Sequence, residues 1–198
     1  MFYLNDEEEK NGKQDKEGFD GLQAKLLKTR TLLLSGEINK EQAEKLIKQL
    51  LLLEADGDDP IKVFIDSPGG DADAGYAIFD MLRFVGPDVL TIGMGTVASA
   101  AALVHLAAKK ENRLSLPNAH FLIHQPLSGI RGVATEIEIH AKELEKLREK
   151  INKLIADETG QKVGKVSEDT DRDYWLTAEE ALEYGLISRI ITTRDELG

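Results

Sequence analysis

The stretch that decides the fold is IKVFIDSPGG, residues 61–70. Its first five residues are rich in β-branched and aromatic side chains, which favours a buried strand. The following DSPGG is a turn sequence, and a helix is expected over residues 74–85. A strand, a glycine loop and a helix in this order begin a βαβ unit. The stretch therefore predicts an α/β domain with a largely parallel sheet.

The same alternation continues on both sides of this stretch. Apolar residues spaced three and four apart predict an amphipathic helix over residues 40–53. Further helices are expected over residues 99–109, 135–157 and 177–184. Strands are expected within residues 26–34, after a short helix or turn, and over residues 89–94, 119–124 and 186–192. We find no internal repeat, so residues 21–198 are expected to form a single domain.

Composition excludes several classes of function. The 198 residues are enough for one domain with a sizeable core, and the formal net charge is −11. Such an acidic balance works against binding to nucleic acid or to an anionic membrane surface, so neither is expected as a partner. The absence of cysteine excludes disulfides, thiolate metal sites and cysteine nucleophiles. Residues 89–108 could span a bilayer by length, but their glycines and alanines favour a buried strand, turn and helix.

Residues 1–20 differ in composition from the remainder of the chain. They hold seven acidic and three basic residues, with two glycines, and few apolar ones. We expect a flexible acidic arm that contributes nothing to the core. The arm also lacks the basic and apolar regions of a signal peptide, so a cytoplasmic protein is expected.

Ser99 is a candidate nucleophile, because it begins the helix expected over residues 99–109 directly after a strand. Free N–H groups at such a helix start could bind an oxyanion. The alternative is a small residue packed in an alanine-rich helix, and the flanks do not form the G-x-S-x-G pattern. His124 is the favoured general base, since ligands bind at the carboxyl ends of parallel strands. His105 is expected in the apolar interior and His140 on a solvated helix face.

A third group must orient the imidazole, and the sequence DTDRD offers Asp169, Asp171 and Asp173. Spacing alone does not choose among them. Together with Glu180 they also occupy ligand positions of an EF-hand loop. Tyr174 stands where that loop requires glycine, and Glu180 fits a helix capping box, so no metal site is expected.

Over residues 26–193 the chain resembles the ClpP-type ATP-dependent caseinolytic serine protease family. The resemblance is carried by SPGG (67–70), GMGTVAS (93–99), IHQP (123–126), ATEIEI (134–139), DTDRD (169–173) and ALEYGL (181–186), all in the family's order. It implies the ClpP/crotonase-like fold, a repeated β-β-α superhelix with a protruding handle at about residues 125–157. Residues 126–133 resemble the family's handle strand, which pairs with peptide substrate and with the opposite ring.

The resemblance also implies roles for individual residues. The implied catalytic residues are Ser99, His124 and Asp173, and the implied oxyanion N–H groups are those of Gly70 and Ala100. The implied substrate-binding residues are Gly69, Gln125, Pro126, Leu127, Ser128 and Gly129. Asp171 and Arg172 are implied at the contact between rings.

The implied function is that of a serine endopeptidase that degrades unfolded proteins and peptides. Two stacked heptameric rings, of one subunit or mixed with a paralogue, would enclose a chamber fed by an AAA+ unfoldase. The implied chemistry uses no cofactor, because ATP is consumed only by the unfoldase. The alternatives are a non-catalytic ring subunit that pairs with a paralogous peptidase, and an acyl-CoA enzyme of the crotonase fold.

Three departures from the family pattern stand out. Ala100 and Ala101 replace the usual methionine and glycine, which is expected to alter the S1 pocket. Lys62 replaces a common aromatic residue at the surface pocket for the unfoldase. Residues 1–20 do not match the family's axial N-terminal segment.

Overall fold

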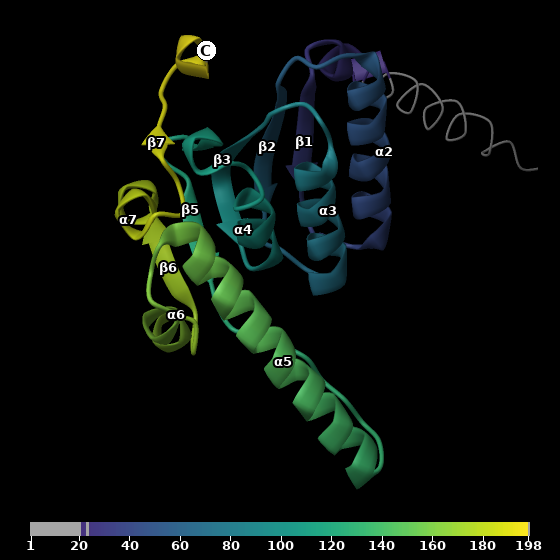
Figure 1. Ribbon diagram of the computed structural model, residues 1–198, viewed down its shortest axis with the longest axis vertical. Coiled ribbons are helices and arrows are strands. Elements are labelled where there is room, and N and C mark those ends of the chain that lie inside the picture. Colours follow the sequence, from purple (N-terminus) through teal and green to yellow (C-terminus); the bar gives the residue numbers. More distant parts are fainter. Residues whose placement is uncertain (1–20, 23, 198) are drawn as a thin grey trace, which may run out of the picture.

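The computed structural model describes residues 21–22 and 24–197, so the arm expected over residues 1–20 lies outside the described residues. The chain alternates strands and helices (Figure 1). The strands are β1 (Thr31–Ser35), β2 (Ile61–Ser67), β3 (Val89–Ala98), β4 (Arg113–Ser115), β5 (His120–Ile123), β6 (Tyr174–Thr177) and β7 (Arg189–Ile190). The helices are α2 (Lys40–Asp56), α3 (Ala72–Phe84), α4 (Ala100–His105), α5 (Ala134–Thr159), α6 (Val163–Asp169) and α7 (Ala178–Tyr184), with 3₁₀ turns η1 (Lys110–Asn112) and η2 (Arg194–Leu197).

Within the described chain, the strands form one sheet that divides along β3. Strands β1, β2, β3, β4 and β7 lie in this order and pair in parallel. The second half of β3 leaves β4 and pairs with β5, which in turn pairs antiparallel with β6. The expected α/β class with a largely parallel sheet is therefore confirmed. The division places the carboxyl ends of β3 and β5 next to each other, where the candidate residues lie.

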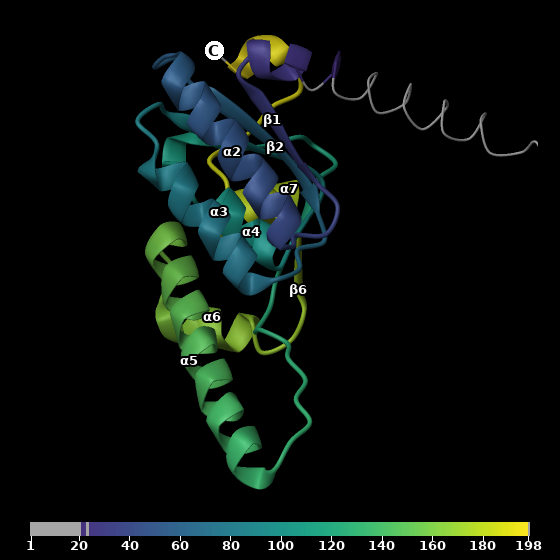
Figure 2. The ribbon, with the colours of Figure 1, turned by 90° about the vertical axis from the view of Figure 1, so that its right-hand side faces the viewer.

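The core fills the space between the sheet and helices α2, α3 and α4, which lie over one face of the sheet (Figure 2). The strand expected at residues 61–65 is confirmed as part of β2, and its side chains alternate in burial, with Ile61, Val63 and Ile65 fully buried. Helix α2 buries one stripe, formed by Ala43, Leu46, Leu50 and Leu53. Both elements are specified by local hydrophobic periodicity, because their apolar residues recur at the strand and helix repeats.

Helix α5 projects from the remainder of the chain (Figure 1). It is 26 residues long and buries side chains only near its C-terminal end: Ile151, Asn152, Ile155, Ala156 and Thr159. The helix expected over residues 135–157 is thus confirmed. Residues 124–133, which run beside it, form no strand within the described chain. A strand here would need a pairing partner from outside the chain.

Several elements differ from the expectation. Strand β3 continues to Ala98, through the turn expected at Gly93–Gly95, with a register shift against β2. Helix α4 is shorter than residues 99–109 and begins after Ser99. Strand β4 of three residues, strand β6 of four residues and helix α6 of seven residues were not expected. Strand β7 covers only two residues of the range 186–192.

The expected capping box at the start of α7 is confirmed. The Glu180 carboxylate accepts from the Thr177 N–H at 2.8 Å, and the Glu180 N–H donates to the Thr177 hydroxyl at 3.2 Å. Glu180 is therefore committed to the helix end. No group of three or more histidine, aspartate or glutamate side chains in the described part of the chain could hold a metal ion. Nor does any helix there have the length and apolar character needed to cross a bilayer.

His105 lies in the core, as expected. Its side chain is only 1% exposed, and neither ring nitrogen has a hydrogen-bond partner among the described residues. The ring packs edge-on against Phe121, with 5.4 Å between centroids. Burial, and secondarily the charge of Arg113, lower the pKa of His105 from 6.5 to about 3. The folded chain therefore holds His105 neutral.

This burial predicts how stability depends on pH. Between pH 6.5 and 3 the unfolded chain binds a proton that folded His105 does not, so the free energy of unfolding should fall as pH drops. The contribution is about 1.4 kcal/mol per pH unit. Urea titrations between pH 6 and 4 should therefore give a shallower slope for His105→Met than for the wild type. His120→Gln, at the exposed end of β5, is the control for loss of a histidine. Equal slopes in the wild type and His105→Met would contradict the assignment.

Candidate active site

Ser99 occupies a sharp turn between β3 and α4. Its backbone has φ 57° and ψ −123°, a conformation that residues other than glycine rarely adopt. The Ser99 N–H still donates to Leu122 of β5 at 2.9 Å, while its carbonyl accepts from Ala102 at 3.0 Å. Strand pairing thus ends and the helix begins at this one residue. The turn resembles a nucleophile elbow although the G-x-S-x-G pattern is absent, because alanines here supply the small neighbours.

The loop at Gly69 and Gly70 packs directly under this turn. A Cβ atom on Gly69 would lie 2.7 Å from Ser99 Cβ and 2.5 Å from the Ala98 carbonyl oxygen. A Cβ atom on Gly70 would lie 2.2 Å from the Ile38 carbonyl oxygen. Both glycines also have positive φ, 88° and 147°. Only glycine fits at either position, so this loop is more than an ordinary turn.

Two backbone N–H groups beside Ser99 are unpaired. Within the described chain, neither the Gly70 N–H nor the Ala100 N–H donates a hydrogen bond. The neighbouring backbone groups are hydrogen-bonded. The Gly69 carbonyl accepts from the Ile38 N–H at 2.8 Å, and the Asp71 N–H donates to the Ile38 carbonyl at 2.8 Å. Gly70, Ser99 and Ala100 line the same cavity. The two residues expected to supply oxyanion donors therefore line the same cavity as the serine, with their N–H groups unpaired within the described chain.

His124 and Asp173 meet because β5 pairs with β6. The register places Ile123, the last residue of β5, opposite Tyr174, the first residue of β6. His124 and Asp173 are the next residues outward. His124 Nε2 lies 2.8 Å from Ser99 Oγ, and His124 Nδ1 lies 3.1 Å from Asp173 Oδ1. The structure thus brings all three expected catalytic side chains together in one hydrogen-bonded series.

The other two aspartates have different partners. Asp169 accepts from the Tyr184 hydroxyl at 2.8 Å and from Lys165 at 2.6 Å. Burial and the Asp169 carboxylate raise the pKa of Tyr184, which keeps its hydroxyl protonated as a donor. Asp171 accepts from Arg148 at 3.1 Å. The three carboxylates that could share a face in an extended chain are therefore separated.

A cavity of about 790 Å³ opens beside Ser99. Its walls include Leu103 of α4 and Leu147, Ile151 and Ile155 of α5. These α5 residues were not expected at the site. Their helical spacing predicts an apolar stripe, but nothing in the local sequence shows that the stripe packs beside a serine from another helix.

The expected substrate-binding residues divide into two groups. Pro126, Leu127 and Ser128 line the cavity. Gly69, Gln125 and Gly129 do not line it. The Gln125 N–H instead donates to Thr170 at 2.6 Å, and its side-chain amide donates to the Asp171 carbonyl at 2.6 Å. Gln125 therefore ties the loop after His124 to the segment that carries Asp173.

The expectation that His140 faces solvent is wrong. It is half-buried, lines the cavity, and lies with Nε2 2.8 Å from Ser128 Oγ. The acidic neighbours of His140 suggested a solvated face, but residues 124–133 run beside α5 to its tip (Figure 2), and Ser128 of this segment contacts the His140 ring.

Comparison with known proteins identifies the family. Residues 14–194 match the family described as Clp protease. The chain belongs to the Clp protease family. An ATP-dependent Clp protease proteolytic subunit 2 of Treponema denticola is 60% identical, covering 100% of this chain and 98% of the relative. A proteolytic subunit 3 of Rhizobium etli is 46% identical, over 98% of this chain and 100% of the relative.

A solved structure agrees with the sequence relatives. A ClpP1 point mutant from Listeria monocytogenes is 52% identical and superposes with a TM-score of 0.84, covering 89% of this chain and 99% of that one. The expected ClpP-type fold is confirmed. This Clp protease chain is therefore a peptide hydrolase of the proteolytic-subunit type. No finding favours the non-catalytic or acyl-CoA alternative.

The close packing at Gly70 gives a prediction. Gly70→Ala should displace the loop from Ser99, because the added Cβ meets the backbone of Ile38. A displacement of about 1 Å can lower kcat/KM about 100-fold, and we expect a loss of this size in a peptidase assay. Gly164→Ala in α6, where a Cβ meets nothing within 4 Å, is the matched control and should keep normal activity. Retention of near-normal kcat/KM by Gly70→Ala would refute the argument.

Proposed function

We propose that this Clp protease subunit is a serine endopeptidase with Ser99 as the nucleophile. The observation that carries the proposal is the series Ser99 Oγ, His124 Nε2, His124 Nδ1 and Asp173 Oδ1, with contacts of 2.8 and 3.1 Å. In the tautomer assigned here, Nδ1 carries the proton and donates to Asp173, which leaves Nε2 free to accept the serine proton. Ser99 Oγ then attacks the peptide carbonyl, and His124 returns the proton to the leaving amine.

The Gly70 and Ala100 N–H groups are proposed to bind the oxyanion of the tetrahedral intermediate. Both are unpaired within the described chain, and both lie beside Ser99. Donors that need no other partner can stabilise charge that develops only during reaction, and each is worth about 100- to 1000-fold in rate. Hydrolysis by this route goes through an acyl-enzyme at Ser99. The proposed chemistry calls for no metal or organic cofactor.

The proposed substrates are unfolded polypeptides. Pro126, Leu127 and Ser128 line the cavity from a segment that forms no strand within the described chain. An extended peptide could pair with this free backbone, as a strand adds to a sheet edge. The side chain before the cleaved bond would enter the apolar part of the cavity, between α4 and α5. Selection would then rest on backbone pairing and apolar shape.

We also propose that the chain forms two stacked heptameric rings, homomeric or mixed with a paralogue, and acts with an AAA+ ATPase that consumes ATP. The names of the relatives support an ATP-dependent protease. Helix α5 supports assembly, since Ile137 and Ile139 are exposed on its projecting part. Asp171 and Arg172, both exposed, are proposed at the contact between rings.

A fluorophosphonate probe tests the nucleophile. It should label wild-type Ser99, and Ser99→Ala should remain unlabelled and inactive while it assembles normally by light scattering. Peptide mapping of the labelled protein identifies the modified residue. Equal labelling of Ser99→Ala would show that another residue is the nucleophile.

The role of Asp173 is tested by comparing its substitution with that of Asp169, four residues earlier in the chain. Asp173→Asn should lower kcat about 10⁴-fold, because the amide favours the wrong tautomer of His124. Asp169→Asn is the matched control, since Asp169 contacts Tyr184 and Lys165 and should leave kcat almost unchanged. The assignment fails if correctly assembled Asp173→Asn retains a near-normal rate.

A further inference from the structure

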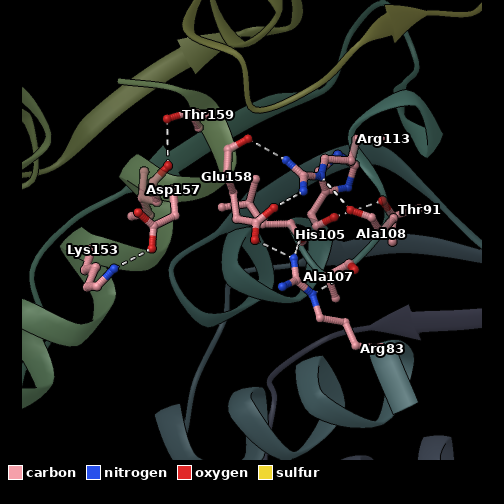
Figure 3. Close-up of polar contacts among 12 residues, drawn as sticks. Arg83, Thr91, His105, Ala107, Ala108, Arg113, Lys153, Asp157, Glu158 and Thr159 are labelled. Carbon is pink, nitrogen blue, oxygen red and sulfur yellow. Dashed lines mark hydrogen bonds and ion pairs between the residues drawn. The ribbon is translucent and has the colours of Figure 1, made fainter. Parts of the chain in front are cut away.

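A partly buried charge cluster joins the segment after α4 to the C-terminal end of α5 (Figure 3). Glu158, in the last turn of α5, lies between two arginines from other elements. Its Oε1 accepts from Arg83 of α3 at 2.5 Å, and its Oε2 accepts from Arg113 of β4. The exposed fraction of the side chain is 18% for Glu158 and 2% for Arg113. One carboxylate thus bridges a buried cation, Arg113, and a partly exposed one, Arg83.

The two arginines also donate hydrogen bonds to backbone carbonyls. Arg113 donates to the Ala108 carbonyl at 2.8 Å and to the Glu158 carbonyl at 2.9 Å. Arg83 donates to the carbonyls of Leu106 and Ala107, each at 3.2 Å. The carbonyls of a helix end need such donors, and a cation there is favourable. The cluster therefore fastens the segment after α4 to the end of α5.

Both fastened helices form walls of the cavity beside Ser99. Helix α4 is only six residues long and begins directly after Ser99, with Leu103 on the cavity side. Helix α5 contributes Ile151 and Ile155 from its packed end, the latter one turn before Glu158. The remainder of α5 projects and makes little contact with the core. The link at Glu158 thus lies one turn beyond Ile155 and connects this wall of the cavity to the segment that follows α4.

We propose that Glu158 is a positioning residue that sets the width of this cavity and so determines which apolar side chain is accepted before the cleaved bond. The inference rests on the proposed function. Removing the carboxylate charge leaves Arg113 buried and without its ionic partner. Such an arginine is strongly unfavourable, so the end of α5 should move to admit water. The cavity would then lose its fit to a particular side chain, while Ser99, His124 and Asp173, held by β5 and β6, stay in place.

The test compares two peptide substrates that differ only in leucine or alanine before the cleaved bond. Rates are expressed per active site titrated with fluorophosphonate, in the assembled full-length protein. An apolar pocket discriminates about 10- to 200-fold per methylene at best. We expect Glu158→Gln to reduce the leucine-over-alanine ratio of kcat/KM about 10-fold, mainly through KM, with the labelling rate unchanged. Asp157→Asn, next to it in the same helix and paired with Lys153 at 2.8 Å, is the matched control and should keep the wild-type ratio.

Two variants of Arg83 test the proposal independently, in case Glu158→Gln does not fold. Arg83 is 42% exposed, so Arg83→Gln should fold. It should also lower the leucine-over-alanine ratio of kcat/KM, by a smaller factor than Glu158→Gln does. Arg83→Lys should restore most of the wild-type ratio, because it keeps a charge beside Glu158.

The outcomes separate this inference from the proposed function. A lowered melting temperature with an unchanged substrate ratio in Glu158→Gln and Arg83→Gln would mean that the cluster acts on stability alone, which overturns the proposal. Wild-type protein that is active but unlabelled at Ser99 would instead overturn the proposed function, and with it this inference.

Discussion

Gly69 lies so close to the turn at Ser99 that no side chain fits between them, and Gly70 is packed as tightly against Ile38. This packing fixes the turn in a backbone conformation that costs a serine on the order of 1–3 kcal/mol, and pairing of Ser99 with β5 helps to maintain it. Gly70 and Ala100, whose N–H groups are unpaired within the described chain, line the cavity together with Ser99. Everything else in the site is arranged around this turn.

The second requirement is the antiparallel pairing of β5 with β6. These strands are separated by fifty residues of chain, including the whole of α5, yet their register decides that Asp173 reaches His124. From residue types and spacing, any of three aspartates could have been the partner of His124. The spacing argument assumed an extended chain, whereas Asp169 is the last residue of helix α6. The family resemblance chose Asp173, and the geometry agrees with that choice.

The sequence predicts those elements whose apolar residues repeat with the period of a strand or a helix. The strand at residues 61–65 and the apolar stripe of α2 were predicted correctly, because each element buries one face against the same core. Strand β4 could not be predicted, since three residues carry no period and pair only because β3 and β7 lie beside them. The half-buried position of His140 and the cavity walls on α5 were missed for the same reason. They depend on contacts between segments far apart in the chain.

The packing of α5 at one end has a mechanical consequence. A helix of 26 residues is about 39 Å long, and its exposed apolar side chains lie far from the cluster that holds it. Ile137 is 21 residues from Glu158, about 31 Å along the helix, whereas Ile155 is three residues away, about 4.5 Å. If the helix tilts as a rigid rod about its fastened end, Ile137 moves about seven times as far as Ile155. The projecting part can therefore move to fit a partner subunit while Ile155, the cavity residue nearest to Glu158, hardly moves. This geometry is compatible with the two roles proposed for the helix, in assembly and in substrate selection.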